Sequence, residues 1–349
     1  MQTTHEIIYS SSSSLPSILS SSVDLVVTSP PYPMIEMWDE LFFNLNPDIE
    51  SSLTSYPSSA FELMHLELDK TWTEIDRLLK PGSIVCINIG DATRKINCNF
   101  ALYSNSSRII RKFLELGYFC LPSILWRKQT NSPTKFMGSG MLPPGAYVTL
   151  EHEHILLFRK GSKREFNSPE SKLNRRRSAY FWEERNLWFS DIWEFKGVSQ
   201  KLNSEVLRSR SAAYPFELAF RLINMFSVQG DTVLDPFLGT GTTTLAAITS
   251  CRNSIGVEID KNFKSIILES IRKVKDFANG YIDNRLQTHL AFVQQKEETH
   301  SFKHRNSVYG FPVMTAQETD LYFPKIENVK IKDESLFEII YKNKEKIYS

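Results

Sequence analysis

The sequence predicts an α/β fold built on a mainly parallel sheet, with a smaller lobe attached. Two segments support this prediction. An apolar, β-branched run at 23–27 stops abruptly at the five residues Thr28-Ser29-Pro30-Pro31-Tyr32, and a second run at 233–235 passes through a glycine turn into a helix. Buried parallel strands are continuous apolar runs, and open α/β sheets bind ligands at the carboxyl ends of their strands. We therefore expect both turns to lie at the ligand-binding edge of the sheet.

The composition limits the class of protein. A chain of 349 residues with 41% hydrophobic residues suits one enlarged α/β domain with a smaller lobe. The net charge is only +1, so contact with nucleic acid would require locally concentrated positive charge. The four cysteines, at positions 86, 98, 120 and 251, have no paired spacing and predict neither a zinc site nor a disulfide framework. No run approaches the ~18 apolar residues of a membrane span. The cysteine pattern fits a reducing cytosol, and a cytoplasmic location is expected.

The first half of the chain alternates strands and helices. Residues 5–9 predict a strand at the edge of the sheet, and residues 44–60, which are polar and contain two prolines, predict a loop. Residues 61–80 have a helical pattern that ends at Lys80-Pro81-Gly82, and residues 84–89 follow as a strand.

A later strand, predicted at 151–160 after a Gly/Pro-rich loop at 131–147, alternates two glutamates with two histidines. A metal site is one interpretation of this pattern. Alternation in a strand, however, places His152 and His154 on one face and Glu151 and Glu153 on the other. Paired polar side chains on the rim of the sheet are therefore the favoured interpretation, and no bound metal is expected.

The turn Ser29-Pro30-Pro31-Tyr32 resembles the catalytic motif of the DNA amino methyltransferases, which methylate exocyclic nitrogens. The resemblance implies that the Ser29 hydroxyl and the Pro30 carbonyl accept hydrogen bonds from the amine, while Tyr32 stacks on a flipped base. The serine form is usual in cytosine-N4 enzymes, whereas adenine-N6 enzymes more often carry Asp or Asn. Taken alone, the motif could also be an ordinary strand-ending turn.

The second motif strengthens the resemblance. The segment 233–243 is similar to the family's loop for S-adenosylmethionine, whose product is S-adenosylhomocysteine, and Glu258 falls where the ribose-binding carboxylate belongs. A dinucleotide-binding turn is the alternative, although the third glycine of that fingerprint is missing. The predicted cofactor-binding residues are Asp235, Pro236, Phe237, Gly239, Gly241, Thr242 and Glu258. The helix at 214–223 resembles the one that precedes this strand in the family.

The catalytic motif precedes the cofactor motif, an order similar to that of the beta group of these enzymes. The resemblance extends from the start of the chain to about residue 275. It implies the S-adenosylmethionine-dependent methyltransferase (Rossmann-like) sheet with a circularly permuted motif order and a smaller DNA-recognition lobe.

A basic segment lies between the two halves. Residues 159–185 contain nine Lys or Arg against four Glu, and several aromatic residues follow. A solvated face with a small aromatic core is one interpretation. The resemblance instead implies a target-recognition region, in which Arg164, Arg175, Arg176 and Arg177 are the predicted contacts to DNA phosphates.

The predicted domains are a catalytic half at 1–160, a recognition insertion at 161–205, a cofactor half at 206–277 and an extension at 278–349. The extension could be a small lobe or could wrap around the core. The resemblance implies a cytosine-N4 methyltransferase acting on double-stranded DNA and paired with a restriction endonuclease, without necessarily contacting it. Adenine-N6 methylation and a catalytically silent DNA-binding module are the alternatives. A monomer is favoured.

Overall fold

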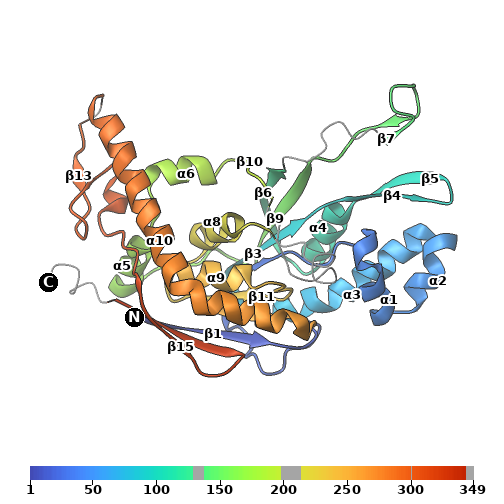
Figure 1. Cartoon of the computed structure of the whole chain (residues 1–349), viewed down its shortest axis with the longest axis horizontal. Helices are drawn as coiled ribbons and strands as arrows, with labels where there is room; N and C mark the ends of the chain where they lie inside the picture. The colour runs from blue at the N-terminus through green and yellow to red at the C-terminus, as the bar shows by residue number, and fades with distance from the viewer. Residues whose placement is uncertain (129–136, 198–213, 300, 343–349) are drawn as a thin grey trace.

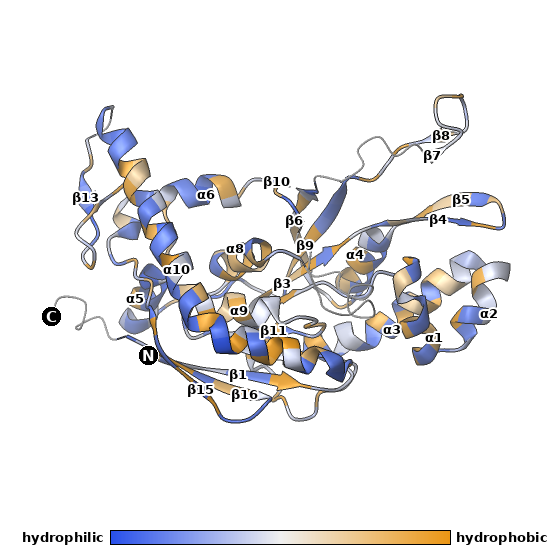
Figure 2. Ribbon diagram, in the orientation of Figure 1, coloured by the Kyte–Doolittle hydropathy of each residue, from blue (hydrophilic) through white to orange (hydrophobic). Residues whose placement is uncertain are grey.

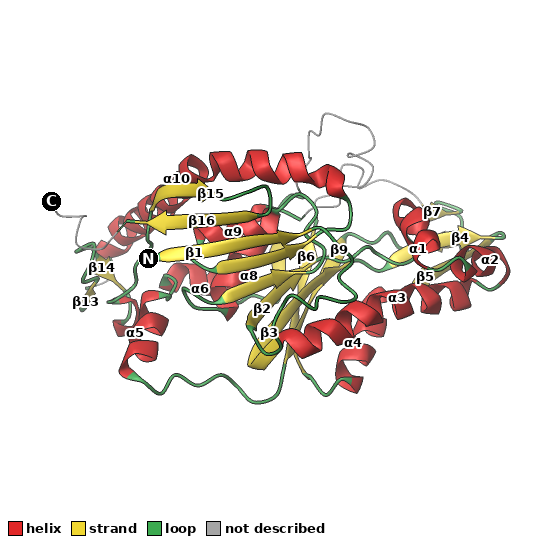
Figure 3. Cartoon of the chain, turned by 90° about the horizontal axis from the view of Figure 1, so that it is seen from below, coloured by secondary structure: helices red, strands yellow, loops and turns green. Residues whose placement is uncertain are grey.

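The computed structural model describes residues 1–128, 137–197, 214–299 and 301–342, so parts of the predicted 131–147 loop and 161–205 insertion lie outside the described residues. A ten-stranded sheet organises the chain (Figure 3). Strands β9 and β16 run opposite to their neighbours, and the other eight share one direction. In spatial order the strands are β10 (Ile192–Glu194), β6 (Phe119–Arg127), β9 (His152–Arg159), β3 (Leu79–Ile89), β2 (Val23–Thr28), β11 (Thr232–Asp235), β12 (Asn253–Val257), β1 (Gln2–Ile8), β16 (Leu336–Tyr341) and β15 (Ile326–Ile331). The predicted α/β class is confirmed.

Helices cover both faces of the sheet (Figure 1). On one face, α3 (Pro57–Leu78) and α4 (Asn105–Glu115) pack on β2 and β3, with Trp72 and Phe113 fully buried among strand side chains such as Val26. On the other, α8 (Phe216–Phe226) and α9 (Thr242–Thr249) pack on β2 and β11. Every residue of β2 is buried, as a central parallel strand requires.

The remaining elements are short or project from the sheet. Two hairpins, β4 (Ala92–Ile96) with β5 (Asn99–Tyr103) and β7 (Met137–Gly138) with β8 (Ala146–Tyr147), extend on the same side of the molecule (Figure 1). The Phe100 and Tyr147 rings stack at 4.3 Å and join them. The other short helices and strands are η1 (Glu36–Trp38), α5 (Pro169–Arg177), α6 (Trp182–Trp188), η2 (Lys261–Phe263), β13 (His304–Arg305), β14 (Pro312–Val313) and η3 (Ala316–Glu318).

The loop expected at 44–60 is wrong. The region forms α1 (Asp39–Leu45), α2 (Asp48–Ser55) and the start of α3. The two prolines that suggested a loop stand at helix starts, because Pro47 precedes the first residue of α2 and Pro57 is the first residue of α3. Proline is tolerated there, since the missing N–H has no partner within the helix.

The edge position expected for residues 5–9 is also wrong. Strand β1 lies inside the sheet, parallel to β12 on one side and antiparallel to β16 on the other. The chain returns from the cofactor half through α10 (Lys264–Glu297), a helix of 34 residues, and then adds β15 and β16 beside β1. Helix α10 crosses residue 277, so no break in secondary structure coincides with that predicted boundary.

Burial of histidines should make stability pH-dependent. His5 is fully buried between Thr3 Oγ1 and Ser254 Oγ, each 2.8 Å from one ring nitrogen, and desolvation lowers its pKa from 6.5 to about 3. Between these two pH values the unfolded chain binds a proton that the folded chain excludes. The free energy of unfolding should therefore fall as pH drops below 6.5, by up to about 1.4 kcal/mol per pH unit for this one group.

Denaturant titrations between pH 7.5 and 4 test this prediction. The variant His5→Gln should show a shallower loss of stability in acid than the wild type, whatever its stability at pH 7.5. Equal slopes for the two proteins would contradict the assignment.

Candidate active site and cofactor loop

The two sequence motifs leave the sheet side by side. Strands β2 and β11 pair in parallel, with Leu25 opposite Val233 and Val26 opposite Leu234. The turn that begins at Ser29 and the glycine loop after Asp235 therefore emerge from adjacent strands at the same carboxyl edge. This is the position at which open α/β sheets bind ligands.

Asp235 joins the two motifs. It is 2% exposed, and one carboxylate oxygen accepts hydrogen bonds from Thr28 Oγ1 at 2.6 Å and from the Phe237 backbone N–H at 3.1 Å. The other oxygen accepts from Thr243 Oγ1 and, at 3.2 Å, from the Tyr214 hydroxyl. Burial raises the pKa of Asp235, and these four donors oppose the increase. The Asp235 carboxylate thus accepts four hydrogen bonds from within the protein. Its predicted contact with a cofactor stays a prediction.

The hydroxyl of Tyr32 is the centre of a polar network beside Ser29. Tyr32 Oη lies 3.0 Å from Ser29 Oγ and donates to Glu153 Oε2 at 3.0 Å. Asn88 Nδ2 donates to both Tyr32 Oη, at 2.9 Å, and Glu153 Oε2, at 2.6 Å. Lys128 Nζ forms an ion pair with the other oxygen of Glu153. Since the single tyrosine hydrogen goes to Glu153, Ser29 is the donor to Tyr32.

The ring of Tyr32 is also fixed by packing. A Cβ on Gly90 would lie 3.1 Å from Tyr32 Cε2, so the absence of a side chain there lets the ring approach the backbone. Asn105 Nδ2, at the start of α4, donates to the carbonyls of Pro33 at 3.1 Å and Gly90 at 2.9 Å. These two hydrogen bonds hold the turn after Ser29 next to the end of β3. Desolvation and the charge of Glu153 raise the pKa of Tyr32, so its hydroxyl stays protonated.

The glycine loop has the shape of a ligand cradle. Gly239 and Gly241 adopt φ values of +56° and +87°, a conformation that disfavours other residues. Nothing lies within 4 Å of a Cβ placed on Gly239, whereas Gly241 is the N-cap of α9 and would bring a Cβ to 3.3 Å from Ile267. Open space beside backbone at the mouth of the loop fits the approach of a ligand.

Glu258 follows β12 and faces this loop. Its two oxygens accept hydrogen bonds from the backbone N–H groups of Gly239, at 2.7 Å, and Asp260, at 2.8 Å. Burial raises its pKa, and these two donors oppose the increase. Each oxygen of a carboxylate has a further lone pair, so Glu258 could still accept from a ribose hydroxyl. The carboxylate and the cradle together fit an adenosine-containing cofactor.

The other predicted cofactor residues surround the loop. Pro236 is buried, and the Phe237 ring contacts Trp72 edge-on at a centroid distance of 5.9 Å. Thr242 is the first residue of α9. The structure thus gathers all seven predicted cofactor residues within the β11–α9 turn and the end of β12.

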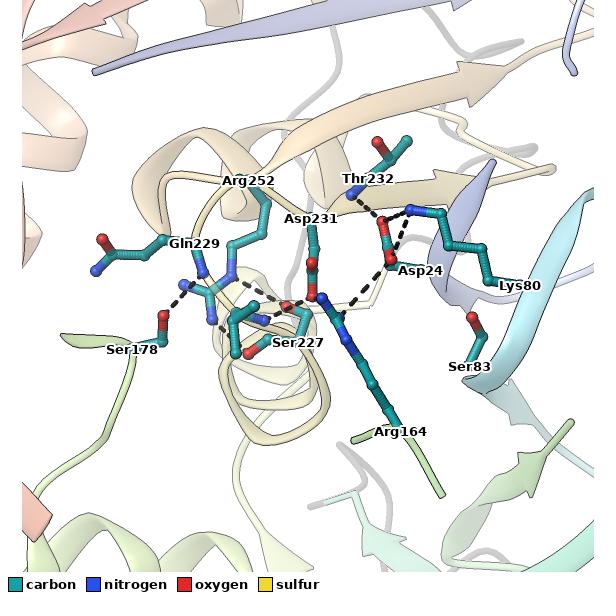
Figure 4. Close-up of polar contacts among 12 residues, drawn as sticks. Asp24, Lys80, Ser83, Arg164, Ser178, Ser227, Gln229, Asp231, Thr232 and Arg252 are labelled. Carbon is teal, nitrogen blue, oxygen red and sulfur yellow. Dashed lines mark hydrogen bonds and ion pairs between the residues drawn. The ribbon is translucent and has the colours of Figure 1, made fainter. Parts of the chain in front are cut away.

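The predicted DNA-contacting arginines lie elsewhere. Arg164 Nη1 is 2.7 Å from Asp231 and 3.7 Å from Asp24, within a polar network at the amino ends of β2 and β11 (Figure 4). Asp24 and Ser29 are at opposite ends of β2, about 16 Å apart at 3.3 Å per residue. The structure therefore does not bring Arg164 together with the Ser29 turn.

The other three predicted arginines belong to α5, which is almost entirely hydrophilic (Figure 2). Arg175 stacks on Phe166, while Arg176 forms an ion pair with Asp320 at 2.8 Å. The Arg177 carbonyl accepts a hydrogen bond from the Tyr322 N–H. With Arg164, both Arg175 and Arg176 line a cavity of about 1090 Å³ at this amino edge.

The sequence did not predict the roles of Asn88, Lys128 and Glu153. Asn88 stands near the end of a predicted strand, and the alternating pattern at 151–160 predicts only a rim position for Glu153. No local signal links them to Tyr32, because β3 and β9 become neighbours only in the folded sheet.

His152 and His154 do share a face, as predicted, with ring centroids 5.0 Å apart. No cluster of three metal-ligating side chains occurs among the described residues.

Comparisons with known proteins agree with this geometry. Residues 23–269 match the family model described as DNA methylase, of the N6/N4 type. The chain is 53% identical to Type II methyltransferase M.MthZI of Methanothermobacter thermautotrophicus, over 98% of this chain and 96% of the relative. It is 52% identical to Type II methyltransferase M.MjaI of Methanocaldococcus jannaschii, over 77% and 91% of the respective chains.

Solved structures show the same fold. The Thermus thermophilus protein TTHA0409, in complex with S-adenosyl-L-methionine, superposes with a TM-score of 0.60 and 30% identity over 77% of this chain and 96% of that one. PvuII DNA methyltransferase (cytosine-N4-specific) superposes with a TM-score of 0.50 at 18% identity, over 79% and 93% of the respective chains. At that identity the likeness concerns the fold alone.

The sheet, the permuted motif order and the cofactor cradle define an S-adenosylmethionine-dependent methyltransferase. The chain belongs to the N6/N4 DNA methylase family, and it is a DNA methyltransferase of the Type II, restriction–modification kind. No helix in the described parts of the chain is long and apolar enough to cross a membrane.

Replacement of Glu258 tests the cofactor assignment. Glu258→Ala removes the predicted acceptor for a ribose hydroxyl and the acceptor that fixes the Gly239 N–H. Calorimetry should show binding of S-adenosylmethionine weakened by at least tenfold, about 1.4 kcal/mol, at an unchanged fold. Glu269→Ala, which removes an exposed carboxylate on α10, is the matched control. Unchanged affinity in a folded Glu258→Ala protein would refute the role of this carboxylate.

Proposed function

We propose that the protein transfers a methyl group from S-adenosylmethionine to N4 of a cytosine flipped out of double-stranded DNA. The observation that carries the proposal is a serine, rather than an acid or amide, at the head of the catalytic turn, with its hydrogen directed to Tyr32. The lone pairs of Ser29 Oγ then face away from that bond and are available to the amine. The similarity to Type II methyltransferases supports the further proposal that this methylation protects host DNA beside a partner endonuclease.

The chemistry requires help because the cytosine amine shares its lone pair with the ring. Hydrogen bonds from the amine to Ser29 Oγ and the Pro30 carbonyl localise that lone pair as the nitrogen becomes tetrahedral. Tyr32 stacks on the base, and the polar network and Gly90 hold its ring in place. The bound cofactor supplies an electrophilic methyl group. Much of the rate acceleration then comes from orientation of the two reactants.

The glycine loop, Glu258 and the neighbouring residues hold the cofactor in this proposal, and Asp235 fixes the loop against the catalytic turn. The target base lies inside the duplex, so it must leave the stack before it reaches Ser29. Neither a metal ion nor a covalent enzyme–base intermediate is part of the proposal.

Product analysis decides the target atom. Duplex DNA methylated by the wild type should contain N4-methylcytosine when its nucleosides are examined by mass spectrometry. Ser29→Ala should lower kcat by about 10²-fold while DNA affinity changes little, because the Ser29 hydrogen bond matters most as the nitrogen changes geometry. Ser12→Ala, at a buried serine outside the turn, is the control. N6-methyladenine in the product would overturn the cytosine assignment and leave the fold intact.

The role of the basic segment in DNA binding is also proposed. Arg164 forms ion pairs with two aspartates, and Arg176 forms one with Asp320. Arg175 contacts an aromatic ring and no carboxylate within the described residues. Arg175 is therefore freer than Arg164 and Arg176 to contact a phosphate. Because the segment lies at the amino edge, such contacts would involve duplex distant from the flipped base.

Salt dependence measures these contacts. If the arginines of α5 neutralise phosphates, changing Arg175, Arg176 and Arg177 together to Ala should reduce the slope of log affinity against log salt by about 0.9 for each phosphate that is no longer neutralised. The double variant Lys273→Ala/Lys275→Ala, on the exposed side of α10, should retain the wild-type slope. An unchanged slope in the arginine variant would show that this run is only solvated.

A further inference from the structure

The network beside Ser29 connects the catalytic turn to a carboxylate through two hydroxyl groups. The distance from Ser29 Oγ to Tyr32 Oη is 3.0 Å, and that from Tyr32 Oη to Glu153 Oε2 is also 3.0 Å. Both lie within the range of ordinary O–H···O hydrogen bonds. Ser29 and Tyr32 each carry one hydrogen, while an ionised carboxylate only accepts, so the chain has one direction, from Ser29 to Glu153.

Other contacts hold this direction. Asn88 Nδ2 donates to both Tyr32 Oη and Glu153 Oε2 and so keeps these two oxygens together. The tyrosine hydrogen goes to the carboxylate, which can only accept. Lys128 pairs with the remaining oxygen of Glu153 and lies 4.7 Å from the Trp126 ring centroid. Burial raises the pKa of Tyr32, so the phenol stays neutral and can act as donor and acceptor at once.

We propose that Ser29, Tyr32 and Glu153 form a proton relay that carries away the proton released by the methylated amine. The inference rests on the proposed function only in placing an exocyclic amine at Ser29. It would apply equally to adenine N6. In this relay, Tyr32 and Glu153 do not touch the reacting nitrogen through their oxygens but receive its proton by way of Ser29.

The amine nitrogen uses its lone pair to bond the methyl carbon, and the carbon–sulfur bond breaks with its electrons passing to sulfur. The nitrogen then holds one proton more than the neutral product. Ser29 Oγ accepts that proton and passes its own hydrogen to Tyr32 Oη, which passes its own to Glu153 Oε2. One N–H bond is lost and one O–H bond is formed at Glu153, while Ser29 and Tyr32 are regenerated.

The direction of transfer is favourable. An exocyclic amine whose lone pair is delocalised into the ring is a very weak base, so its protonated form is a strong acid. Even a carboxylate paired with lysine accepts a proton from it. Glu153 is 12% exposed and Lys128 is 37% exposed, so Glu153 can return the proton to water on the Lys128 side after each turnover.

The relay predicts that two different substitutions slow methyl transfer to a similar extent. Glu153→Gln keeps an oxygen that can accept from Tyr32 but removes the proton acceptor, and Tyr32→Phe keeps the ring but interrupts the chain. In single-turnover assays at saturating cofactor and duplex, each should slow methyl transfer by about 10²-fold, the usual size of a proton-transfer contribution. The double variant should be no slower than either single one, because the two groups act in series.

The pH profile separates a relay from a merely structural role. The acidic limb of the wild-type pH–rate profile should differ from that of Glu153→Gln, because only the wild type has a carboxylate as the terminal proton acceptor. The other titratable groups around Glu153 are Lys128, its ion-pair partner, and, across the strand, His152 and His154, the latter 3.8 Å from Asp91. These groups remain in the variant, so a limb that persists unchanged would overturn the relay.

Glu151→Gln is the matched control, because Glu151 precedes the same strand and its side chain pairs with Arg127 at 3.5 Å near the surface. It should retain the wild-type rate and profile. Calorimetric affinities for S-adenosylmethionine and for duplex DNA should be unchanged in all variants. A parallel loss of binding and rate would overturn the relay in favour of a structural role.

If Glu153→Gln fails to fold with Lys128 left unpaired, the combined variant Glu153→Gln/Lys128→Met removes both charges and takes its place. Wild-type rates in a folded form of either variant would overturn the relay. The base identity is read separately, from the methylated nucleoside, so N6-methyladenine would refute the cytosine assignment and leave the rate comparison as the test of the relay.

Discussion

The hydrogen bond from Thr28 to Asp235 fixes the arrangement on which the site depends. The two residues are 207 positions apart in the chain, yet they end neighbouring strands, and each precedes one of the two functional turns. A buried carboxylate is costly unless it is well hydrogen-bonded, and Asp235 is stabilised by donors from β2, the glycine loop, α9 and Tyr214. Four separate segments must therefore be in place before this group is satisfied, which couples the geometry of the two turns.

Local patterns in the sequence predicted the two turns, the strands that carry them and their shared edge. Proline restricts the backbone and glycine frees it wherever they occur. The ends of β2 at Thr28 and of β11 at Asp235 can therefore be predicted from the prolines and glycines that follow them. The strand at 84–89 and the helix at 61–80 were confirmed, although α3 ends at Leu78. The strand at 151–160 and the helix at 214–223, which the resemblance implied, were confirmed as well. Prolines at 47 and 57 misled the interpretation, since proline begins helices as readily as it interrupts them.

Contacts made across the sheet could not be predicted in this way. Glu153 reaches Tyr32 only because β9 inserts antiparallel beside β3, and no spacing in the sequence specifies that order. The basic run shows a similar limit. Its composition predicted an excess of positive charge, but Arg164 and Arg176 are engaged by aspartates from distant segments, and the run lies at the opposite edge of the sheet from Ser29.

The pairing of β1 with β16 brings the two ends of the described chain together, with the Tyr341 backbone N–H donating to the Met1 carbonyl at 3.0 Å. Met1 and Tyr341 are thus adjacent, so a link between these two segments would join the described chain into a ring. A cut between the recognition segment and α8 would place the cofactor motif first without moving a single strand of the sheet. The order of the two motifs along such a chain could accordingly change while the three-dimensional site is preserved.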